Sequence, residues 1–136
     1  MSEWLYQGKP FTAEQTEGFY GFIYLIINNT SGRKYVGRKY LTKAATKQVN
    51  GKKKKIRKTS DWETYWSSSE ILKEEVKTLG ESNFTREILH LCRSRSECNY
   101  METKEIFQRD ALLREDYINA WVSCKIHKKH VFGKIT

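Results

Sequence analysis

Apolar runs bounded by turn-forming residues predict a β-hairpin in the first third of the chain. Residues 22–27 are apolar and mostly aromatic or β-branched, and they lie between Gly21 and the turn-forming cluster 28–32, as expected of a buried strand. Residues 34–36 predict a short return strand that stops at Gly37. A two-stranded ribbon is only marginally stable alone. We therefore expect later elements to cover at least one of its faces.

Apolar residues at helical spacing predict two helices further along the chain, with a strand between them. A Ser-x-x-Glu capping box at residues 67–70 begins the first helix, and Gly80 ends it. A second capping box at residues 94–97 begins the other helix. Residues 83–91 predict the strand, with Phe84, Ile88 and Arg86 on one face.

Three further segments flank these elements. Residues 1–20 form an N-terminal extension whose apolar and aromatic side chains could form an extra strand or pack across the sheet, and we favour packing. Residues 42–60 form a basic insertion, and residues 122–136 form a basic C-terminal tail. Residues 1–136 contain no internal repeat and no linker, so they predict a single α+β domain, a small antiparallel β-sheet flanked by helices.

The charge balance indicates that the protein binds a polyanionic partner. The chain has 25 Lys and Arg residues against 16 Asp and Glu residues, and its pI is about 9.5. Nucleic acid is favoured over a membrane, because no basic amphipathic helix stands out and no apolar stretch approaches the ~18 residues that span a bilayer. The first residues lack the features of a signal peptide, so we expect a cytoplasmic protein with reduced thiols.

The cysteines are expected to be free thiols rather than metal ligands. Cys92 and Cys98 are predicted near the core, whereas Cys124 lies close to His127 and His130 in the basic tail. The spacing of these three tail residues matches no common zinc pattern. We therefore interpret this segment as a solvated basic tail.

Two triplets on the predicted hairpin resemble the paired motif of the GIY-YIG nucleases. Residues 22–24 (Phe-Ile-Tyr) and residues 35–37 (Tyr-Val-Gly) are separated by ten residues, with Phe replacing Gly and Val replacing Ile. Neighbouring Gly21 is a candidate for the backbone role of the replaced glycine. The order of elements over residues 21–121, the aromatic-Ser-Ser start of the first helix, the Asn-Phe-Thr strand and the mid-helix Glu102 also resemble GIY-YIG endonucleases of the phage type.

The resemblance implies a one-metal hydrolysis of phosphodiester bonds. It assigns Glu102 as the ligand of a divalent cation, Mg²⁺ or Mn²⁺, with Glu105 as the fallback ligand. An oxygen site with few protein ligands suits Mg²⁺, because this ion keeps several waters. It assigns Tyr24 and Tyr35 to the nucleophilic water, and either phenol is a candidate to accept a proton.

The resemblance also implies several supporting residues. An arginine after the second triplet would bind the scissile phosphate, and we slightly favour Arg57 over Arg38. Tyr65 is the nearest match to a His or Tyr that precedes the first helix in many members, and Asn119 matches an asparagine that braces the site. Hydrogen bonds to the phosphate are expected from two hydroxyl side chains, Ser67 and Ser68.

The basic insertion has two interpretations, a flexible solvated loop or an arm that grips phosphates and becomes ordered on DNA. We favour the arm, because a nuclease-like hairpin precedes it. Phosphate contacts made by such a cluster weaken steeply with salt. The residues expected to bind DNA are the lysines Lys52, Lys53, Lys54, Lys55 and Lys58.

The resulting expectation is a metal-dependent DNA endonuclease without a membrane partner, acting in the host cytoplasm if phage-encoded. Stand-alone homing members of the family carry a separate DNA-recognition domain. Specificity here is expected to come from the insertion, the tail or oligomerisation, with a homodimer as one option. The alternative is a non-catalytic basic protein that keeps the nuclease fold and binds nucleic acid.

Overall fold

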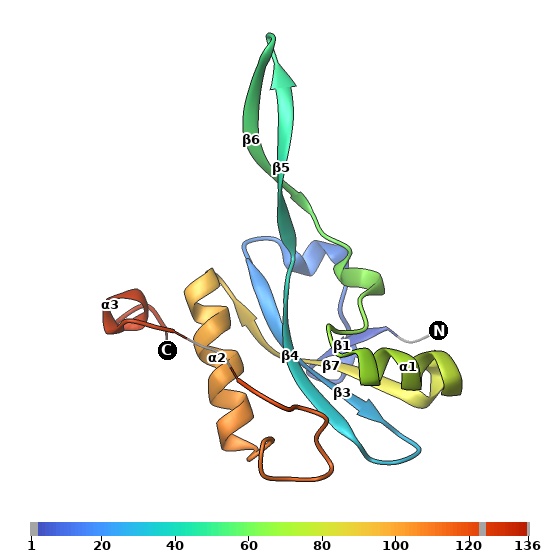
Figure 1. Ribbon diagram of the computed structural model, residues 1–136. Helices are drawn as coiled ribbons and strands as arrows, with labels where there is room; N and C mark the ends of the chain where they lie inside the picture. Colours follow the sequence, from blue (N-terminus) through green and yellow to red (C-terminus); the bar gives the residue numbers. More distant parts are fainter. Residues whose placement is uncertain (1–2, 123–124, 136) are drawn as a thin grey trace.

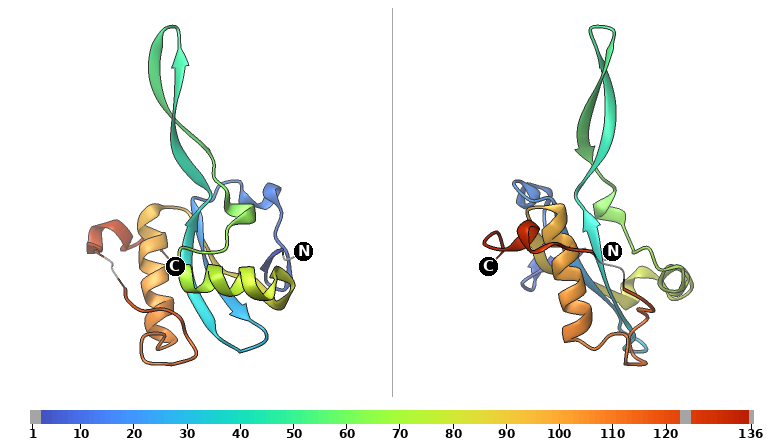
Figure 2. Two further views of the ribbon diagram at one scale, coloured as in Figure 1. Left: turned by 45° about the vertical axis from the view of Figure 1, so that its right-hand side comes forward. Right: turned by 60° about the vertical axis from the view of Figure 1, so that its left-hand side comes forward.

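A five-stranded sheet between two helices forms the body of the computed structural model, which describes residues 3–122 and 125–135. The strand order is β2-β1-β7-β3-β4. Helices α1 (Glu70–Leu79) and α2 (Arg95–Gln108) cover opposite faces of this sheet (Figures 1 and 2). The α+β prediction is therefore confirmed.

The predicted hairpin is formed by β3 (Gly21–Asn28) and β4 (Lys34–Tyr40), which pair antiparallel. Strand β4 continues through Gly37, so the prediction that it stops there was wrong. Gly37 lies opposite Tyr24, and a Cβ atom at Gly37 would collide with the Tyr24 phenol. The glycine leaves room for a ring on the neighbouring strand, and it does not end its own strand.

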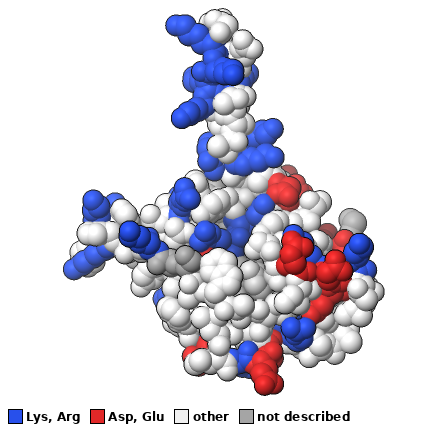
Figure 3. Space-filling view, in the orientation of Figure 1, with Lys and Arg blue, Asp and Glu red and all other residues white. Residues whose placement is uncertain are grey.

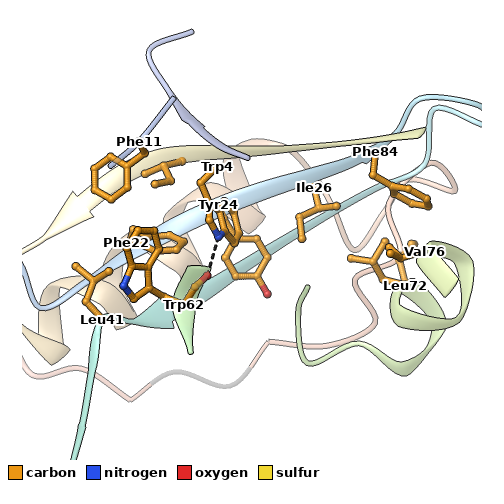
Figure 4. Packing of buried hydrophobic residues seen from close by; sticks show 12 residues of the cluster. Trp4, Phe11, Phe22, Tyr24, Ile26, Leu41, Trp62, Leu72, Val76 and Phe84 are labelled. Atoms are coloured by element: carbon orange, nitrogen blue, oxygen red, sulfur yellow. Dashed lines mark hydrogen bonds between the residues drawn. The ribbon is translucent and has the colours of Figure 1, made fainter. Parts of the chain in front are cut away.

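The N-terminal extension adds two strands at the other side of the sheet. Strand β1 (Trp4–Tyr6) pairs parallel with β7 (Phe84–Cys92) and antiparallel with the short β2 (Lys9–Pro10). Both alternatives for this segment therefore occur, because Trp4 lies in an added strand and also packs in the core. Its ring is buried in the core, and its indole nitrogen donates a hydrogen bond to the carbonyl oxygen of Trp62 at 2.7 Å (Figure 4).

The basic insertion forms a ribbon of its own, made of β5 (Thr42–Val49) and β6 (Lys52–Thr59). It projects from the body as a continuation of β4 (Figure 1). Asn50 and Gly51 both have positive φ angles, 52° and 77°, as a two-residue type I′ hairpin turn requires. Both interpretations of this segment expected it to lack regular structure in the free protein, and both were wrong on that point, because Asn-Gly closes a regular hairpin.

The predicted capping residues are found at the ends of both helices, except at the start of α1. Its N-cap is Ser69, whose hydroxyl accepts a hydrogen bond from the Leu72 amide, and not the predicted Ser67. Ser67 is buried at a φ angle of 110°, and its hydroxyl accepts from the Ser69 amide. Ser94 caps α2, and Gly80 follows α1 at a φ angle of 90°.

Two hydrophobic cores lie on the two faces of the sheet. One packs α1 against Phe22, Tyr24 and Ile26 of β3, and the other packs α2 against Ile23 and Leu25. This matches the alternation of side chains along a strand. Figure 4 shows the first core, with the Tyr24 ring among the other aromatic rings, and the Tyr24 hydroxyl lies beside Gly37 of β4.

The remaining segments are short. Single 3₁₀ turns occur at η1 (Ala13–Thr16), η2 (Trp62–Thr64) and η3 (Glu81–Asn83), and the tail contains α3 (Lys128–Val131). Cys92 and Cys98 are buried free thiols, while Cys124 lies outside the described residues. Within the described part of the chain, no helix has the length and apolar character needed to cross a membrane.

Candidate active site

A cleft of about 510 Å³ lies along the exposed edge of β4. Residues 35–38 of β4 form its floor, and the start of α1, the middle of α2 and residues 118–122 form its walls. These segments are far apart in sequence, and β4 is an edge strand to which both helices come close. The cleft therefore collects side chains from both faces of the sheet.

Three tyrosines from β3, β4 and the segment before α1 lie beside one another, but only Tyr35 lines the cleft, and Tyr24 is almost fully buried behind it. The ring centroid of Tyr24 lies 6.2 Å from that of Tyr35 and 6.0 Å from that of Tyr65. The Tyr35 hydroxyl lies 3.4 Å from the Ser68 hydroxyl. Strand β7 has a register shift opposite Ile23 and Tyr24, an irregularity often found beside active sites.

The environment keeps two of these phenols protonated. Burial, followed by the nearby Tyr65 and Tyr35, raises the pKa of Tyr24 well above 10.0. Burial also raises the pKa of Tyr35, partly offset by its hydrogen bond with Ser68. The carboxylate of Glu102 contributes to both increases, which shows that the three groups share one electrostatic environment.

Glu102 enters the cleft from α2 and forms an ion pair with Arg38 of β4. The Arg38 guanidinium donates a hydrogen bond of 3.0 Å to Glu102 Oε1, and the side chains are 35% and 20% exposed. Burial raises the pKa of Glu102 above 4.5, and Arg38 opposes this increase. Glu105 points elsewhere and pairs with Arg109 on the same helix.

Asn119 fixes the C-terminal segment to the floor of the cleft. Its side-chain oxygen accepts from the Val36 amide at 3.0 Å, and its side-chain nitrogen donates to the Val36 carbonyl at 2.8 Å. The amide thus occupies the free edge of β4 as a neighbouring strand would. The Ile118 amide also donates to the Lys34 carbonyl, and the Lys34 amide donates to the Asp116 carbonyl, so these bonds hold the wall of the cleft in place.

The structure does not bring every expected residue to the cleft. Arg57 lies at the root of the ribbon, where its guanidinium donates to the carbonyl and hydroxyl of Thr42 and lies 5.2 Å from the Tyr20 ring. Ser67 is buried, whereas Ser68 lines the cleft. The geometry therefore favours Arg38 over Arg57. The expected DNA-binding lysines, which all lie on β6, are Lys52, Lys53, Lys54, Lys55 and Lys58.

Sequence reasoning gave no role in the site to Lys39. Its ammonium lies 4.0 Å from the Tyr65 ring centroid and 2.6 Å from the Asp61 carboxylate. Because β4 continues through Gly37, Lys39 lies on the same face as Tyr35. The alternation of side chains along a strand could have predicted this position, because residues 35, 37 and 39 share one face. Our prediction missed it because it ended the strand at Gly37.

The donor groups of the cleft suit a hard cation that keeps most of its water. Glu102 and Glu70 are the carboxylates that line it. Residues 3–122 and 125–135 contain no cluster of three or more His, Cys, Asp or Glu side chains. Mg²⁺ is commonly held by one or two carboxylates, with waters and a substrate phosphate completing its ligands. Glu102 is suited to hold such an ion. The described residues do not suit a metal site whose ligands all come from the protein.

Comparison with known proteins decides the family. Residues 4–122 match the family model described as "Putative endonuclease segE, GIY-YIG domain". The chain belongs to the GIY-YIG endonuclease family. No curated protein and no solved structure matched the chain.

Family membership accounts for the layout of the body. The GIY-YIG match begins at β1 and ends at the wall of the cleft, so it includes the N-terminal strands and the ribbon. A GIY-YIG domain supports endonuclease activity, and with it a nucleic-acid substrate. The two motif tyrosines lie on adjacent strands of one hairpin.

Proposed function

We propose that this GIY-YIG protein is a divalent-metal-dependent endonuclease that hydrolyses phosphodiester bonds of DNA in the β4 cleft. The supporting observation is that Tyr35 of β4 and Glu102 of α2 line one cleft, and that the Glu102 carboxylate raises the pKa of both Tyr35 and the neighbouring, buried Tyr24. Grouped titratable side chains with perturbed pKa values in a cleft are typical of active sites.

Glu102 would hold the cation, Mg²⁺ or Mn²⁺, with Oε2 available because Arg38 contacts Oε1. Such an ion supplies charge stabilisation for the phosphoryl oxygens when bound. The Arg38 guanidinium suits a phosphate oxygen through its paired N–H donors and permanent charge. A bound phosphate would therefore compete with Glu102 for Arg38.

The phenols would position the attacking water rather than meet it as phenolates, because their raised pKa values keep them protonated near neutral pH. The water oxygen forms a new bond to phosphorus while the bond to the 3′-oxygen breaks; the proton of the water passes to solvent, and the leaving 3′-oxygen takes a proton from solvent. Tyr35 and Ser68 present hydroxyls to the cleft, and Tyr65 lies against Tyr24. Asn119 holds the floor against which these groups are aligned.

Supercoiled plasmid cleavage tests this proposal. We expect Glu102→Gln to lower the Mg²⁺-dependent cleavage rate by at least about 10²-fold, the size of effect seen when one stabilising group is removed from a preorganised site. Glu105→Gln is the matched control, because Glu105 lies on the same helix but pairs with Arg109. EDTA should stop the reaction of the wild type.

The outcome that contradicts the proposal is equally specific. If wild type and Glu102→Gln leave supercoiled, linear and single-stranded DNA equally intact in Mg²⁺ and Mn²⁺, the protein is not a metal-dependent nuclease. Retained DNA binding in that case would support the alternative of a non-catalytic binder with this fold.

A further inference from the structure

The β5–β6 ribbon contains almost the whole positive charge surplus of the protein. It has eight of the 25 Lys and Arg residues and none of the 16 Asp and Glu residues, so the remainder has 17 cations against 16 acids. Figure 3 shows Lys and Arg covering the projecting ribbon, whereas Asp and Glu gather on the body. The polyanion-binding character of the chain therefore belongs mainly to this element.

The ribbon places like charges directly opposite each other. Lys43 pairs with Lys58 and Lys47 pairs with Lys54 across the two strands. Like charges in this arrangement destabilise a strand pair, and the ribbon has little apolar packing to offset them, since Ile56 is only half-buried. The phosphates of a polyanion lying along the ribbon would attract these lysines and so offset the repulsion between them.

The residue types on the ribbon favour a duplex over a single strand. Residues 42–59 contain no aromatic side chain, and non-specific single-strand binders stack bases on aromatic rings. What the ribbon offers instead is ammonium groups and hydrogen-bonding side chains, including Thr46 and Gln48. These groups suit phosphates and base edges of paired DNA.

The shape and the two-sided charge of the ribbon fit the major groove. A two-stranded ribbon is among the elements that the groove of B-form DNA, about 12 Å wide, admits. Lys47 and Lys54 lie on one face of the ribbon, and Lys53 and Lys55 lie on the other. An element inserted between two rows of phosphates needs cations on both faces. The major groove of double-stranded RNA is too narrow and deep for such an element.

We propose that the β5–β6 ribbon binds in the major groove of duplex DNA beside the cleft and so sets which phosphate reaches the active site. The proposal rests on the proposed function, since it names the substrate as a duplex and adds a second contact region. The strand that supplies Tyr35 and Arg38 is the one that leads into the ribbon.

The root of the ribbon is held to the body, which limits where its tip reaches. Leu41 is buried, and the Ser60 amide and hydroxyl donate to the carbonyls of Leu41 and Tyr40. From Arg38 in the cleft to Asn50 in the turn is 12 residues, at most about 40 Å of extended chain. At ~3.4 Å per base pair, the ribbon reaches no further than about 12 base pairs from the cleft.

Salt-dependent binding to a 30-base-pair duplex, measured in EDTA, tests the ribbon. The triple variant Lys47→Gln, Lys53→Gln and Lys54→Gln should bind at least about tenfold more weakly. Its slope of log affinity against log salt should fall by about 2 to 3, at ~0.9 per lost phosphate contact. The matched control removes three exposed lysines of the body by Lys9→Gln, Lys77→Gln and Lys104→Gln. An equal loss in both variants would overturn the proposal.

Two further arms identify the duplex and the groove. Relative to the wild type, the ribbon variant should lose less affinity for single-stranded DNA and for double-stranded RNA than for duplex DNA. Equal losses of affinity for all three would contradict the proposal that the ribbon recognises duplex DNA. Dimethyl sulfate should reveal protection of guanine N7, in the major groove, within about 12 base pairs on one side of the cut. Protection of adenine N3 alone would overturn the groove assignment.

These measurements separate the ribbon from the nuclease proposal. If the wild type binds but never cuts, while the ribbon variant loses duplex affinity, the nuclease proposal fails and the ribbon proposal stands. If the wild type cuts, and the ribbon variant binds and protects guanine N7 as the wild type does, the ribbon proposal alone fails.

Discussion

Among single residues, Gly37 has an unusual influence on the site, because the Tyr24 phenol occupies the space that a side chain there would need. The two residues are cross-strand partners on the hairpin. A methyl group at position 37 would push the ring out of its place between Tyr35 and Tyr65. The motif glycine therefore acts through the position of a tyrosine on the other strand.

We expect Gly37→Ala to destabilise the protein by about 1–3 kcal/mol, the usual cost of overpacking, and to impair cleavage. Because the clash is with one ring, Tyr24→Leu should remove much of the penalty. Urea unfolding of both single variants and the double variant gives the coupling energy, expected at about 0.5–3 kcal/mol. Strictly additive effects would contradict a specific contact between these residues.

The pH dependence of Glu102 follows from its surroundings. Burial raises its pKa above 4.5 and Arg38 lowers it, so the carboxylate form that binds a cation should disappear as pH falls through this raised value. Arg38→Gln removes the opposing charge and should move the midpoint to a higher pH. Protonation relieves the cost of burying the charge, so Glu102 should favour folding more at low pH than at neutral pH.

Carbon-13 NMR of labelled glutamate carboxyls in the metal-free protein measures this midpoint. Lys39→Gln is the control, because Lys39 pairs with Asp61 rather than with Glu102. A Glu102 midpoint at or below 4.5, or one that Arg38→Gln lowers, would contradict the electrostatic description.

At the scale of elements, the edge of β4 organises the site, and Asn119 substitutes for a neighbouring strand along part of it. Removing a buried polar partner typically costs about 1–3 kcal/mol. We expect Asn119→Ala to destabilise by this amount and to speed hydrogen exchange of the Val36 amide. Asn29→Ala is the comparison, since the exposed Asn29 amide bonds only the Thr85 side chain. Equal losses in the two variants would argue against a special role for Asn119.

The sequence predicted elements best where local rules and packing agree. The apolar run of β3, Gly80 after α1 and the Ser94 cap of α2 all follow from local chemistry, and each was found. The start of α1 was misplaced because two serines near it satisfy capping rules, and only the positive φ angle of Ser67 excludes it. Strand β1 was not favoured because its pairing with β7 joins residues about 80 positions apart.

The candidate site was predictable in its residue types but only partly in its geometry. Tyr24, Tyr35 and Glu102 could be found by resemblance to the family. The preference for Arg57 over Arg38 came from spacing along the sequence. That spacing misleads because the ribbon leaves the body and returns to it, so Arg57 ends beside Thr42 instead of the cleft. The Asn50-Gly51 pair was the signal that would have predicted the ribbon.

At the scale of the whole molecule, charge and chemistry are separated in space. Outside the ribbon, which has eight cations and no acid, the chain is nearly neutral, with 17 Lys and Arg residues against 16 Asp and Glu residues, and this part holds the cleft (Figure 3). Under the two proposals, this arrangement would let affinity for DNA change through the ribbon without changing the side chains of the cleft. The two proposals can therefore be tested with separate sets of variants.

The ribbon leaves the body and re-enters it at one point, because Thr42 and Thr59 are paired opposite each other. Because its two ends lie side by side, this insertion can be replaced by another segment without separating the strands of the body. A hairpin of another length or composition, grafted between these two threonines, would leave the scaffold closed. Protein engineers therefore have a single graft point at which the reach of this enzyme can be redesigned while its catalytic edge stays constant.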